Sequence, residues 1–518
     1  MTIKKKCMLI ILDGWGARDE THGNAVAKAA TPVLNQLGDS YPCSLLTTFG
    51  NAVGLPDAIM GNSEVGHLNI GAGRIVFQDL LRIDRAIADG SFAENAALCH
   101  LMDTVQKAGS TLHLMGLVSD GGVHSQLTHL LALLEMAAEK QIKQVAVHAI
   151  MDGRDTPPTG GAGYLQTLQS HLDQTGVGFI ATICGRYFAM DRDKRWDRIE
   201  KAFRLYTRAE GISENDALTA IQNAYQKKET DEFIKPIVIT DANGTPRGQV
   251  QNGDGILFFN FRADRAREIT RAFTDEAFDA FERDPRPNLC GYTCMTLYDA
   301  EFPLPIAFEP KSMQNILGEV ISNAGLKQLR IAETEKYAHV TYFFSGGREE
   351  PFPGEDRCLI PSPREVATYD QKPEMSAVEV TQEVLNRLDS NAYDLIVLNF
   401  ANMDMVGHTG ILPAAVKACE TVDHCVGRIV AKLKEKQWSA IVTADHGNAE
   451  KMIADDGNPH TAHTVGRVKC ILVDDDFKGR ALQDGALCDI APTLLQIMGL
   501  PQPQEMTGKS LIAISDQP

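Results

Sequence analysis

The stretch Ser439-Ala-Ile-Val-Thr443-Ala-Asp445-His446-Gly-Asn448 decides the fold class of this protein. Its apolar part, Ala440–Val442, is short and continuous and lies between segments that read as helices. Such a run is typical of a strand buried in a parallel sheet, and the carboxyl ends of such strands are where α/β proteins bind ligands. We therefore predict an α/β protein with an acid and a histidine at the end of this strand.

Six other short apolar runs repeat this pattern along the chain. Each precedes a loop rich in glycine or aspartate and then a helical segment, the order expected of layered α/β domains. Ser91-x-x-Glu94 predicts the start of a helix that ends at Gly109, and Ser312 is expected to cap another. The six further strands are predicted at Met8–Leu12, Leu112–Val118, Val145–Ile150, Phe179–Ile183, Ile256–Phe259 and Leu395–Leu398.

The polar residues after these strands divide the chain into two zones. Acids and histidines follow the strands near both ends, and arginines follow the strands in the middle. Because ligands bind at the carboxyl ends of parallel strands, one sheet should hold metal and the other an anion. We predict a discontinuous domain, 1–77 with 310–518, interrupted by an inserted domain, 78–309. The crossings should lie near Arg74–Gln78 and within Phe302–Pro310.

Composition limits the class of protein. The 518 residues include 43 glycines and 23 prolines, too few for a collagen or a disordered chain. The net charge of −18 argues against nucleic-acid binding but leaves room for a local basic pocket. No apolar run approaches the roughly 18 residues of a membrane span. Eleven cysteines without a C-x-x-C pair indicate free thiols, so we expect a soluble cytoplasmic protein.

Acids and histidines near the ends of the chain are candidate metal ligands. Carboxylate oxygens and imidazole nitrogens that come from several strand ends suit a pair of divalent cations. One Asp-His pair in a loop is commonly structural, but several such groups together favour a metal site. His460 is a weaker candidate than its neighbour in Thr461-Ala-His463-Thr464. The candidates are Asp13, Asp404, His408, Asp445, His446 and His463.

Ser63 is the candidate nucleophile. It lies in Met60-Gly-Asn-Ser63-Glu-Val-Gly-His67, ahead of a helical segment. Backbone N–H groups and the positive end of the helix dipole at such a position suit a phosphoryl group. The simpler interpretation is that Ser63 only caps the helix, with Glu64 in its first turn. A bound metal ion would help the hydroxyl to lose its proton at neutral pH.

Paired arginines follow two strands of the middle zone. Arg186 with Arg192, and Arg262 with Arg265, could bind phosphate or carboxylate bidentately, although a single arginine is usually surface charge. Asp155, in Met151-Asp-Gly-Arg-Asp155, adds a carboxylate among these cations. It could exchange a proton with a substrate, or it could simply pair with an arginine.

Five motifs together make the chain resemble the cofactor-independent (2,3-bisphosphoglycerate-independent) phosphoglycerate mutases of the alkaline phosphatase superfamily. The similarity covers almost the whole chain, in order. The metal motifs alone resemble the superfamily, whereas the surroundings of Ser63 and the arginine pairs are specific to the mutases. The motifs are Ile10-Ile-Leu-Asp13-Gly-Trp-Gly16, Met60-Gly-Asn-Ser-Glu-Val-Gly-His67, Met151-Asp-Gly-Arg-Asp155, Asp404-Met-Val-Gly-His-Thr-Gly410 and Thr443-Ala-Asp-His-Gly-Asn448.

The resemblance implies two α/β domains with mainly parallel sheets, an alkaline-phosphatase-like metal domain and an inserted substrate-binding domain. It implies two ions, one on Asp404, His408 and His463, and the other on Asp13, Ser63, Asp445 and His446. Manganese is usual in bacterial members, and oxygen and imidazole ligands also accept zinc or cobalt. The implied substrate contacts are His124, Arg154, Asp155, Arg186, Arg192, Arg262, Arg265 and Lys336.

The resemblance also implies a reaction. The protein would interconvert 3-phosphoglycerate and 2-phosphoglycerate through a phosphoserine at Ser63, without 2,3-bisphosphoglycerate. Asp155 would move protons between the substrate hydroxyls, assisted by His124. We expect a small-molecule substrate, no nucleic-acid or membrane partner, and a monomer, although the sequence does not fix the oligomeric state.

Three alternatives share parts of this pattern. A metal-dependent phosphatase would use the same ligands and serine but has no use for the paired arginines. A phosphopentomutase would not be expected to carry so long and arginine-rich a middle segment. A scaffold protein with a broken site is disfavoured because the ligands and the nucleophile are all present.

Overall fold

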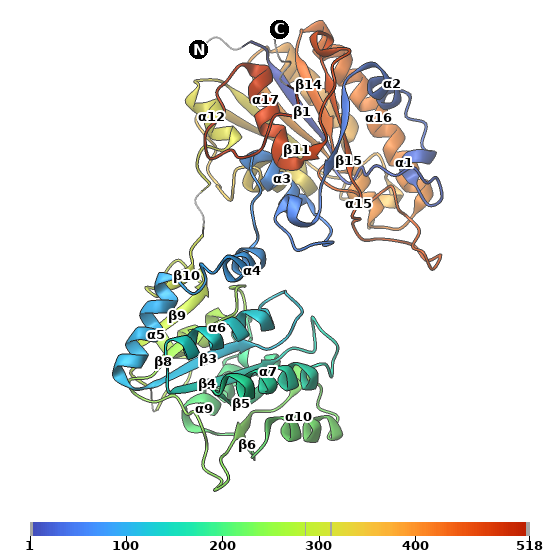
Figure 1. The fold of residues 1–518 in the computed structure, drawn as a ribbon. Coiled ribbons are helices and arrows are strands. Elements are labelled where there is room, and N and C mark those ends of the chain that lie inside the picture. Colours follow the sequence, from blue (N-terminus) through green and yellow to red (C-terminus); the bar gives the residue numbers. More distant parts are fainter. Residues whose placement is uncertain (1–3, 285, 311–312, 514–518) are drawn as a thin grey trace. The chain divides into compact units, whose positions relative to one another are not determined.

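The computed structural model describes residues 4–284, 286–310 and 313–513, and the chain forms two compact units (Figure 1). The first unit comprises residues 1–78 and 312–518, and the second comprises residues 79–311. The divisions lie one and two residues from the predicted domain bounds, 77/78 and 309/310. Ser312, which was expected to cap a helix, lies outside the described residues.

The first unit is built on an eight-stranded sheet in the order β12-β11-β13-β1-β14-β15-β2-β16. The strands from β12 to β14 are parallel, β15 is antiparallel to both of its neighbours, and β16 is parallel to β2. Its strands are β1 (Cys7–Leu12), β2 (Cys43–Thr47), β11 (Gln328–Glu333), β12 (Glu355–Ile360), β13 (Leu395–Phe400), β14 (Ser439–Thr443), β15 (Val468–Val473) and β16 (Gly485–Ala486).

Helices flank this sheet on both sides (Figure 1). The longest, α16, buries a stripe with helical spacing that includes Ala415, Ala418, Val422 and Val426, and it packs on α14 and α2. Burial of this apolar stripe, rather than helix propensity, stabilises such a helix. The helices are α1 (Ala25–Lys28), α2 (Pro32–Ser40), α3 (Ser63–Ala72), α12 (Leu317–Asn323), α13 (Thr334–Ala338), α14 (Ala377–Asp389), α15 (Asn402–Gly407), α16 (Leu412–Glu435) and α17 (Ile490–Met498).

The second unit has its own eight-stranded sheet, in the order β10-β9-β8-β3-β4-β5-β7-β6. Neighbouring strands are parallel except for β5 and β7. The predicted class, two α/β domains with mainly parallel sheets, is confirmed. The strands are β3 (Thr111–Leu117), β4 (Gln144–Met151), β5 (Phe179–Gly185), β6 (Ile212–Glu214), β7 (Ile237–Ile239), β8 (Gly255–Phe258), β9 (Gly291–Thr296) and β10 (Ile306–Phe308).

The helices of the second unit correct one prediction about a helix start. Asn95, not Ser91, caps α5, since its side chain accepts the backbone N–H groups of Ala97 and Leu98. Gly109 ends that helix as predicted, in a left-handed conformation that glycine adopts without strain. The helices are α4 (Asp79–Asp89), α5 (Ala96–Ala108), α6 (Leu127–Glu139), α7 (Gly161–Thr175), α8 (Arg186–Ala189), α9 (Trp196–Arg208), α10 (Ala217–Gln226) and α11 (Arg267–Thr274).

All seven predicted strands are present, within a residue or two at each end. Strand β11 was not predicted because polar side chains interrupt its apolar pattern. Its Gln328, Arg330 and Glu333 are all buried. Arg330 donates a hydrogen bond of 2.7 Å to Gln328 and lies over the ring of Phe344, so contacts with neighbouring side chains make its burial tolerable.

The parallel strands place the polar loops of each unit at the carboxyl ends of its sheet. In the first unit, β1 lies between β13 and β14, so the residues that follow these three strands are neighbours. In the second unit, β3, β4 and β5 are adjacent in the same way. Among the described residues, no helix is both long enough and apolar enough to cross a bilayer.

Candidate active site

Ser63 lies in the first unit, at the first position of α3. Asn62 is the N-cap, because its side chain accepts the backbone N–H of Val65, so the interpretation of Ser63 as an ordinary N-cap is wrong. The Ser63 hydroxyl is 3.1 Å from Oδ1 of Asp13 and 3.0 Å from Nε2 of His446. A helix N-terminus and two site residues thus surround a nearly buried hydroxyl.

Lys336 is the third polar neighbour of this hydroxyl. Its Nζ lies 2.5 Å from Ser63 Oγ, 2.6 Å from Oδ2 of Asp404 and 3.0 Å from Oδ1 of Asp13. Burial disfavours the ammonium, but the two carboxylates raise the pKa of Lys336 above its ordinary value. Lys336 therefore lies with Ser63 and the two carboxylates in the first unit, whereas the arginines predicted to bind substrate lie in the second unit.

Asp404, in the short helix α15 after β13, contacts two histidines. Nε2 of His408 and Nε2 of His463 each lie 3.1 Å from its Oδ1, and the two nitrogens are themselves 3.1 Å apart. Nδ1 of each ring contacts a backbone carbonyl, that of Thr461 or Gly61, which orients the ring. Such convergence of two imidazole nitrogens on one carboxylate is the arrangement that a metal ion requires.

Asp445 and His446 follow β14 and are completely buried. Neither carboxylate oxygen of Asp445 accepts a hydrogen bond from the described residues. Nε2 of His446 is 3.3 Å from Oδ1 of Asp13, and its ring centroid is 4.0 Å from that of His463. Burial favours the neutral ring, but Asp445 and Asp13 raise the pKa of His446 to about 10.

These residues fit a pair of divalent cations. Ligand atoms of Asp404, His446 and His463 lie within 4.8 Å of one another, and so do those of Asp13, His67 and Asp445. A buried carboxylate without donors, as in Asp445, is costly unless a cation satisfies it.

The grouping differs from the expected one in three respects. His408 is in neither group, although its Nε2 lies 3.1 Å from Asp404. His446 groups with Asp404 and His463, although its Nε2 also lies close to Asp13. His67 joins the other group, and its position one helical turn after Ser63 could have indicated this. His460 belongs to neither group.

Arg186 and two aspartates form the centre of the second unit's site. Arg186, buried at the start of α8, donates to Oδ1 of Asp152 at 2.7 Å and to Oδ2 of Asp155 at 2.5 Å. Asp152 also accepts the backbone N–H groups of Arg154 and Asp155 and the hydroxyl of Ser119. Asp152, which was not predicted from the sequence, holds the Asp-Gly-Arg-Asp turn in place.

Asp264 links two more of the predicted arginines to His124. Its carboxylate lies 2.8 Å from Arg192 and 3.1 Å from Arg262, and Oδ1 is 3.7 Å from Nδ1 of His124. Nε2 of the same histidine is 3.8 Å from Asp155. Burial and the charge of Arg186 lower the pKa of His124 to about 4, so its ring is neutral at pH 7.

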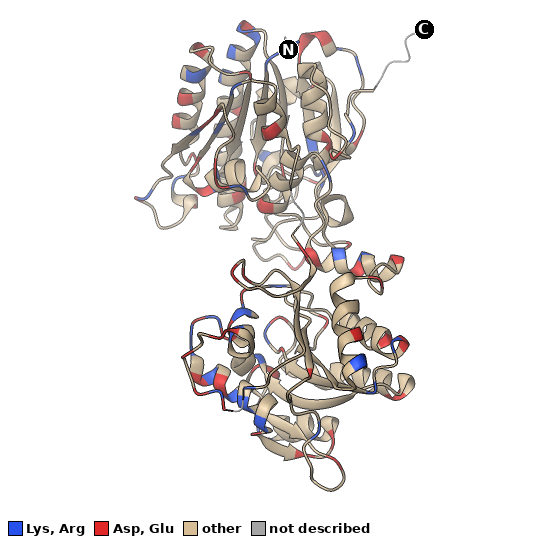
Figure 2. Ribbon diagram, turned by 90° about the vertical axis from the view of Figure 1, so that its left-hand side faces the viewer, with Lys and Arg blue, Asp and Glu red and all other residues tan. Residues whose placement is uncertain are grey.

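A cavity of about 390 Å³ lies among these arginines. Burial and the charges of Arg186, Arg192 and Arg154 lower the pKa of Arg265, which shows how closely these cations gather. In Figure 2 the second unit shows several blue segments close together, mixed with acidic ones. Arg195 and Arg198 also line the cavity and were not predicted. The predicted arginines that line it are Arg154, Arg186, Arg192 and Arg265.

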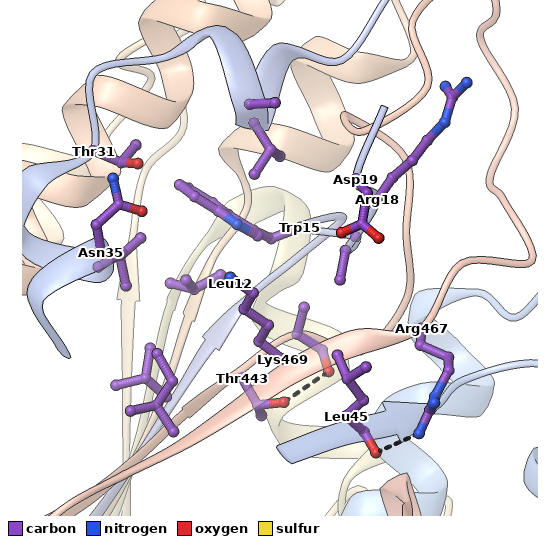
Figure 3. A pocket seen from close by; sticks show the side chains of 18 residues that line it. Leu12, Trp15, Arg18, Asp19, Thr31, Asn35, Leu45, Thr443, Arg467 and Lys469 are labelled. Carbon is purple, nitrogen blue, oxygen red and sulfur yellow. Dashed lines mark hydrogen bonds between the residues drawn. The ribbon is translucent and has the colours of Figure 1, made fainter. Parts of the chain in front are cut away.

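A different cavity, of about 460 Å³, lies in the first unit (Figure 3). Leu12 and Thr443 line it, and they precede Asp13 and Asp445 in the chain. The indole of Trp15 lies among its lining side chains (Figure 3). Its lining includes none of the predicted site residues, so we do not assign the reaction to it.

Comparisons with known proteins give separate family matches for the two units of the chain. Residues 83–300 match the family described as "BPG-independent PGAM N-terminus". Residues 332–464 match the family described as "Type I phosphodiesterase / nucleotide pyrophosphatase". The first match contains the predicted arginines with His124 and Asp155, and the second contains Lys336 and most of the candidate metal ligands.

Full-length relatives are also similar to the chain. The 2,3-bisphosphoglycerate-independent phosphoglycerate mutase of Moorella thermoacetica is 57% identical over 512 residues, and the match covers 99% of each chain. The protein of the same name from Syntrophotalea carbinolica is 56% identical and covers 98% of this chain and 99% of its own. A solved phosphoglycerate mutase of Leishmania mexicana, described at low cobalt concentration, is 32% identical, covers 99% and 98%, and has a TM-score of 0.62.

Proposed function

Since the chain belongs to the family of 2,3-bisphosphoglycerate-independent phosphoglycerate mutases, we propose that its Ser63 carries the phosphoryl group during the reaction. The protein is an isomerase of glycolysis that interconverts phosphoglycerates, depends on divalent metal and needs no 2,3-bisphosphoglycerate. The observation that supports the role of Ser63 is its hydroxyl, which has Asp13, His446 and Lys336 within 2.5–3.1 Å.

In the first half of the reaction, Ser63 Oγ forms a bond to phosphorus while the bond from phosphorus to the glycerate oxygen breaks. The backbone N–H groups at the start of α3 and the Lys336 ammonium offset the charge on the phosphoryl oxygens. The carboxylate of Asp13 accepts the hydrogen bond of the hydroxyl, and the His446 ring, 3.0 Å away, helps to orient the hydroxyl oxygen. Ser63 then holds the phosphoryl group and glycerate is free to change its orientation.

The candidate ligands would hold two ions, which we propose to be manganese. Asp404, His408 and His463, whose ligand atoms lie 3.1 Å apart, would hold one. Asp13, Ser63, Asp445 and His446 would hold the other, with His67 as a further candidate. Bound divalent ions would lower the pKa of the Ser63 hydroxyl and offset phosphoryl charge. Oxygen and nitrogen ligands suit manganese but also accept zinc and cobalt. Metal analysis of protein purified without chelator tests this choice.

In the second half, the other hydroxyl of glycerate attacks the phosphoserine. The arginines of the second unit would hold the glycerate carboxylate in this step. A proton must leave the attacking hydroxyl, and another must reach the oxygen released earlier. Asp155 would move these protons, and neutral His124, 3.8 Å from it, would accept one.

The rival function is a phosphatase in which water, rather than glycerate, attacks the phosphoserine. Its site would need only the first unit, whereas the arginines that line the cavity of the second unit would bind a second anionic group. An enolase-coupled assay of 3-phosphoglycerate, with and without added 2,3-bisphosphoglycerate, separates the two. We expect 2-phosphoglycerate as the main product in both conditions. Inorganic phosphate as the main product would contradict the proposal.

We also propose that the protein acts as a cytoplasmic monomer. All the candidate site residues come from one chain, so the chemistry needs no second copy. The eleven cysteines are free, as is usual in a reducing compartment. Sedimentation equilibrium tests the monomer, for which a mass near 56.6 kDa is expected.

A further inference from the structure

Glu450 is a buried acid that the mechanism above does not use. It lies four residues after His446, and its side chain is 1% exposed. Oε1 accepts a hydrogen bond from the Thr464 hydroxyl, and Oε2 has no partner among the described residues. None of the ion pairs of the described chain involves Glu450. Burial of a carboxylate with one neutral donor is costly, which suggests that the buried Glu450 side chain has a role of its own.

Three chain segments that carry candidate metal ligands enclose this carboxylate. A β-carbon at Gly16, three residues after Asp13, would overlap it, and so would one at Gly447, directly after His446. Thr464, which donates to it, directly follows His463. Because glycine has no β-carbon, the backbone at Gly16 and at Gly447 can approach the Glu450 carboxylate this closely. One side chain therefore contacts the backbone or side chains beside Asp13, His446 and His463.

Backbone hydrogen bonds join the same three segments around Glu450. Thr464 N–H donates to the Gly447 carbonyl at 3.0 Å, and Asn448 N–H donates to the Gly14 carbonyl at 3.1 Å. Ala17 N–H donates to the Arg467 carbonyl at 2.8 Å. The Thr464 hydroxyl also accepts the N–H of Gly466, so its bond to Glu450 fixes the turn after His463.

We infer that Glu450 is a positioning residue that holds the segments bearing Asp13, His446 and His463 at the spacing needed for metal binding. The inference rests on the proposed function, because it concerns the same metal ligands. Glu450 touches neither the substrate nor an ion in this account. Groups that orient ligands without binding metal typically change metal affinity by about 10–100-fold when they are removed.

The experiment titrates Mn²⁺ into the full chain after dialysis against chelator, without phosphoglycerate, and follows binding by calorimetry. We expect Glu450→Ala to weaken Mn²⁺ binding by about 10–100-fold. Glu450→Gln keeps the shape and the acceptor for Thr464, so it should stay within a few-fold of the unchanged protein. Thr464→Val removes the same hydrogen bond from the other side, and adding it to Glu450→Ala should cause little further loss.

Asp423→Ala is the matched control. Asp423 is also a buried acid of the first unit, 3% exposed, but it accepts the N–H groups of Val33 and Leu34 at the start of α2. Its removal should lower the thermal midpoint without weakening Mn²⁺ binding. Unchanged Mn²⁺ affinity in Glu450→Ala, or equal weakening in Asp423→Ala, would overturn the inference. Failure of the unchanged protein to bind Mn²⁺ would instead overturn the proposed metal site.

Discussion

The two candidate sites hold their charged groups in opposite ways. In the first unit, Asp13, Asp445 and His446 are all 0% exposed. In the second unit, the side chains of Arg192 and Arg262 are 44% and 50% exposed, and both pair with Asp264. The first site buries Asp13, Asp445 and His446 completely and leaves only its outer histidines, His408 and His463, partly exposed, whereas the second leaves most of its arginines in contact with water.

This difference is the one expected if the first site holds a permanently bound ion and the second binds a ligand that exchanges in every turnover. A buried charge without partners costs several kcal/mol, so the ligands of the first site favour an ion that stays bound. An exposed arginine loses little when it exchanges one carboxylate partner for another. If the arginines bind the substrate as proposed, the acids beside them would keep them oriented between turnovers, and the substrate would replace those acids as partner.

Ser63→Ala should abolish mutase activity, because it removes the only nucleophile proposed to carry the phosphoryl group. We expect a loss of at least about 1,000-fold in kcat, the scale seen when a covalent nucleophile is removed. No phosphoenzyme should form from labelled 3-phosphoglycerate. The thermal midpoint should change little, since Asn62 rather than Ser63 caps α3. Substantial mutase activity in this variant would mean direct transfer between the two hydroxyls of the substrate.

Asp445→Asn should remove part of the buried negative charge that favours a permanently bound ion. We expect weaker Mn²⁺ binding and a loss of activity of about 100-fold or more, since this carboxylate has no hydrogen-bond donor to replace the ion. Calorimetric titration with Mn²⁺ measures the change. Asp423→Asn is the control, because that buried acid lies within α16 and accepts N–H groups at the start of α2. Equal loss of Mn²⁺ affinity in both variants would contradict a specific role for Asp445.

Arg262→Ala tests the exposed site and should change the products more than the first chemical step. Without this cation, glycerate escapes more often and water attacks the phosphoserine, so the ratio of 2-phosphoglycerate to inorganic phosphate should fall about 10-fold. Arg247→Ala is the matched control, because that arginine lies over the Phe179 ring and is not among the site residues. Slower turnover with an unchanged product ratio would remove Arg262 from the glycerate site.

The smallest effect concerns stability against pH in the presence of chelator. The pKa of His446 is about 10, above the ordinary histidine value of about 6.5. The contribution of His446 to the free energy of unfolding is therefore complete below pH 6.5 and is lost as the pH rises toward 10. The pKa of His124 is about 4, so its contribution is present above pH 6.5 and is lost as the pH falls toward 4.

Thermal midpoints at several pH values measure both limbs. His446→Asn should flatten the alkaline limb and His124→Asn the acid limb, each by a few degrees. Activity with metal present should also fall as the pH drops toward about 6, because the ligands must be deprotonated to bind. Alkaline and acid limbs that survive both substitutions would show that other groups control the pH dependence.

Much of the architecture follows from the sequence. Short apolar runs predict buried parallel strands because a strand covered on both faces needs apolar side chains throughout, as in β1 and β14. Residues that directly follow such strands, among them Asp13 and Asp445, must reach the same edge of the sheet. Helix starts were predicted less accurately from the sequence: Ser91 was expected to cap α5, but Asn95 caps it.

The tertiary structure alone decided which distant residues meet. Lys336 reaches the Ser63 hydroxyl across 273 positions of the chain, and no local pattern encodes that contact. The same holds for the hydrogen bond from Thr464 to Glu450 and for Asp264, which joins two arginines to His124. Periodicity and residue type determine what one segment buries or exposes, whereas the partner of a buried charge depends on how strands far apart in sequence pair in the sheet.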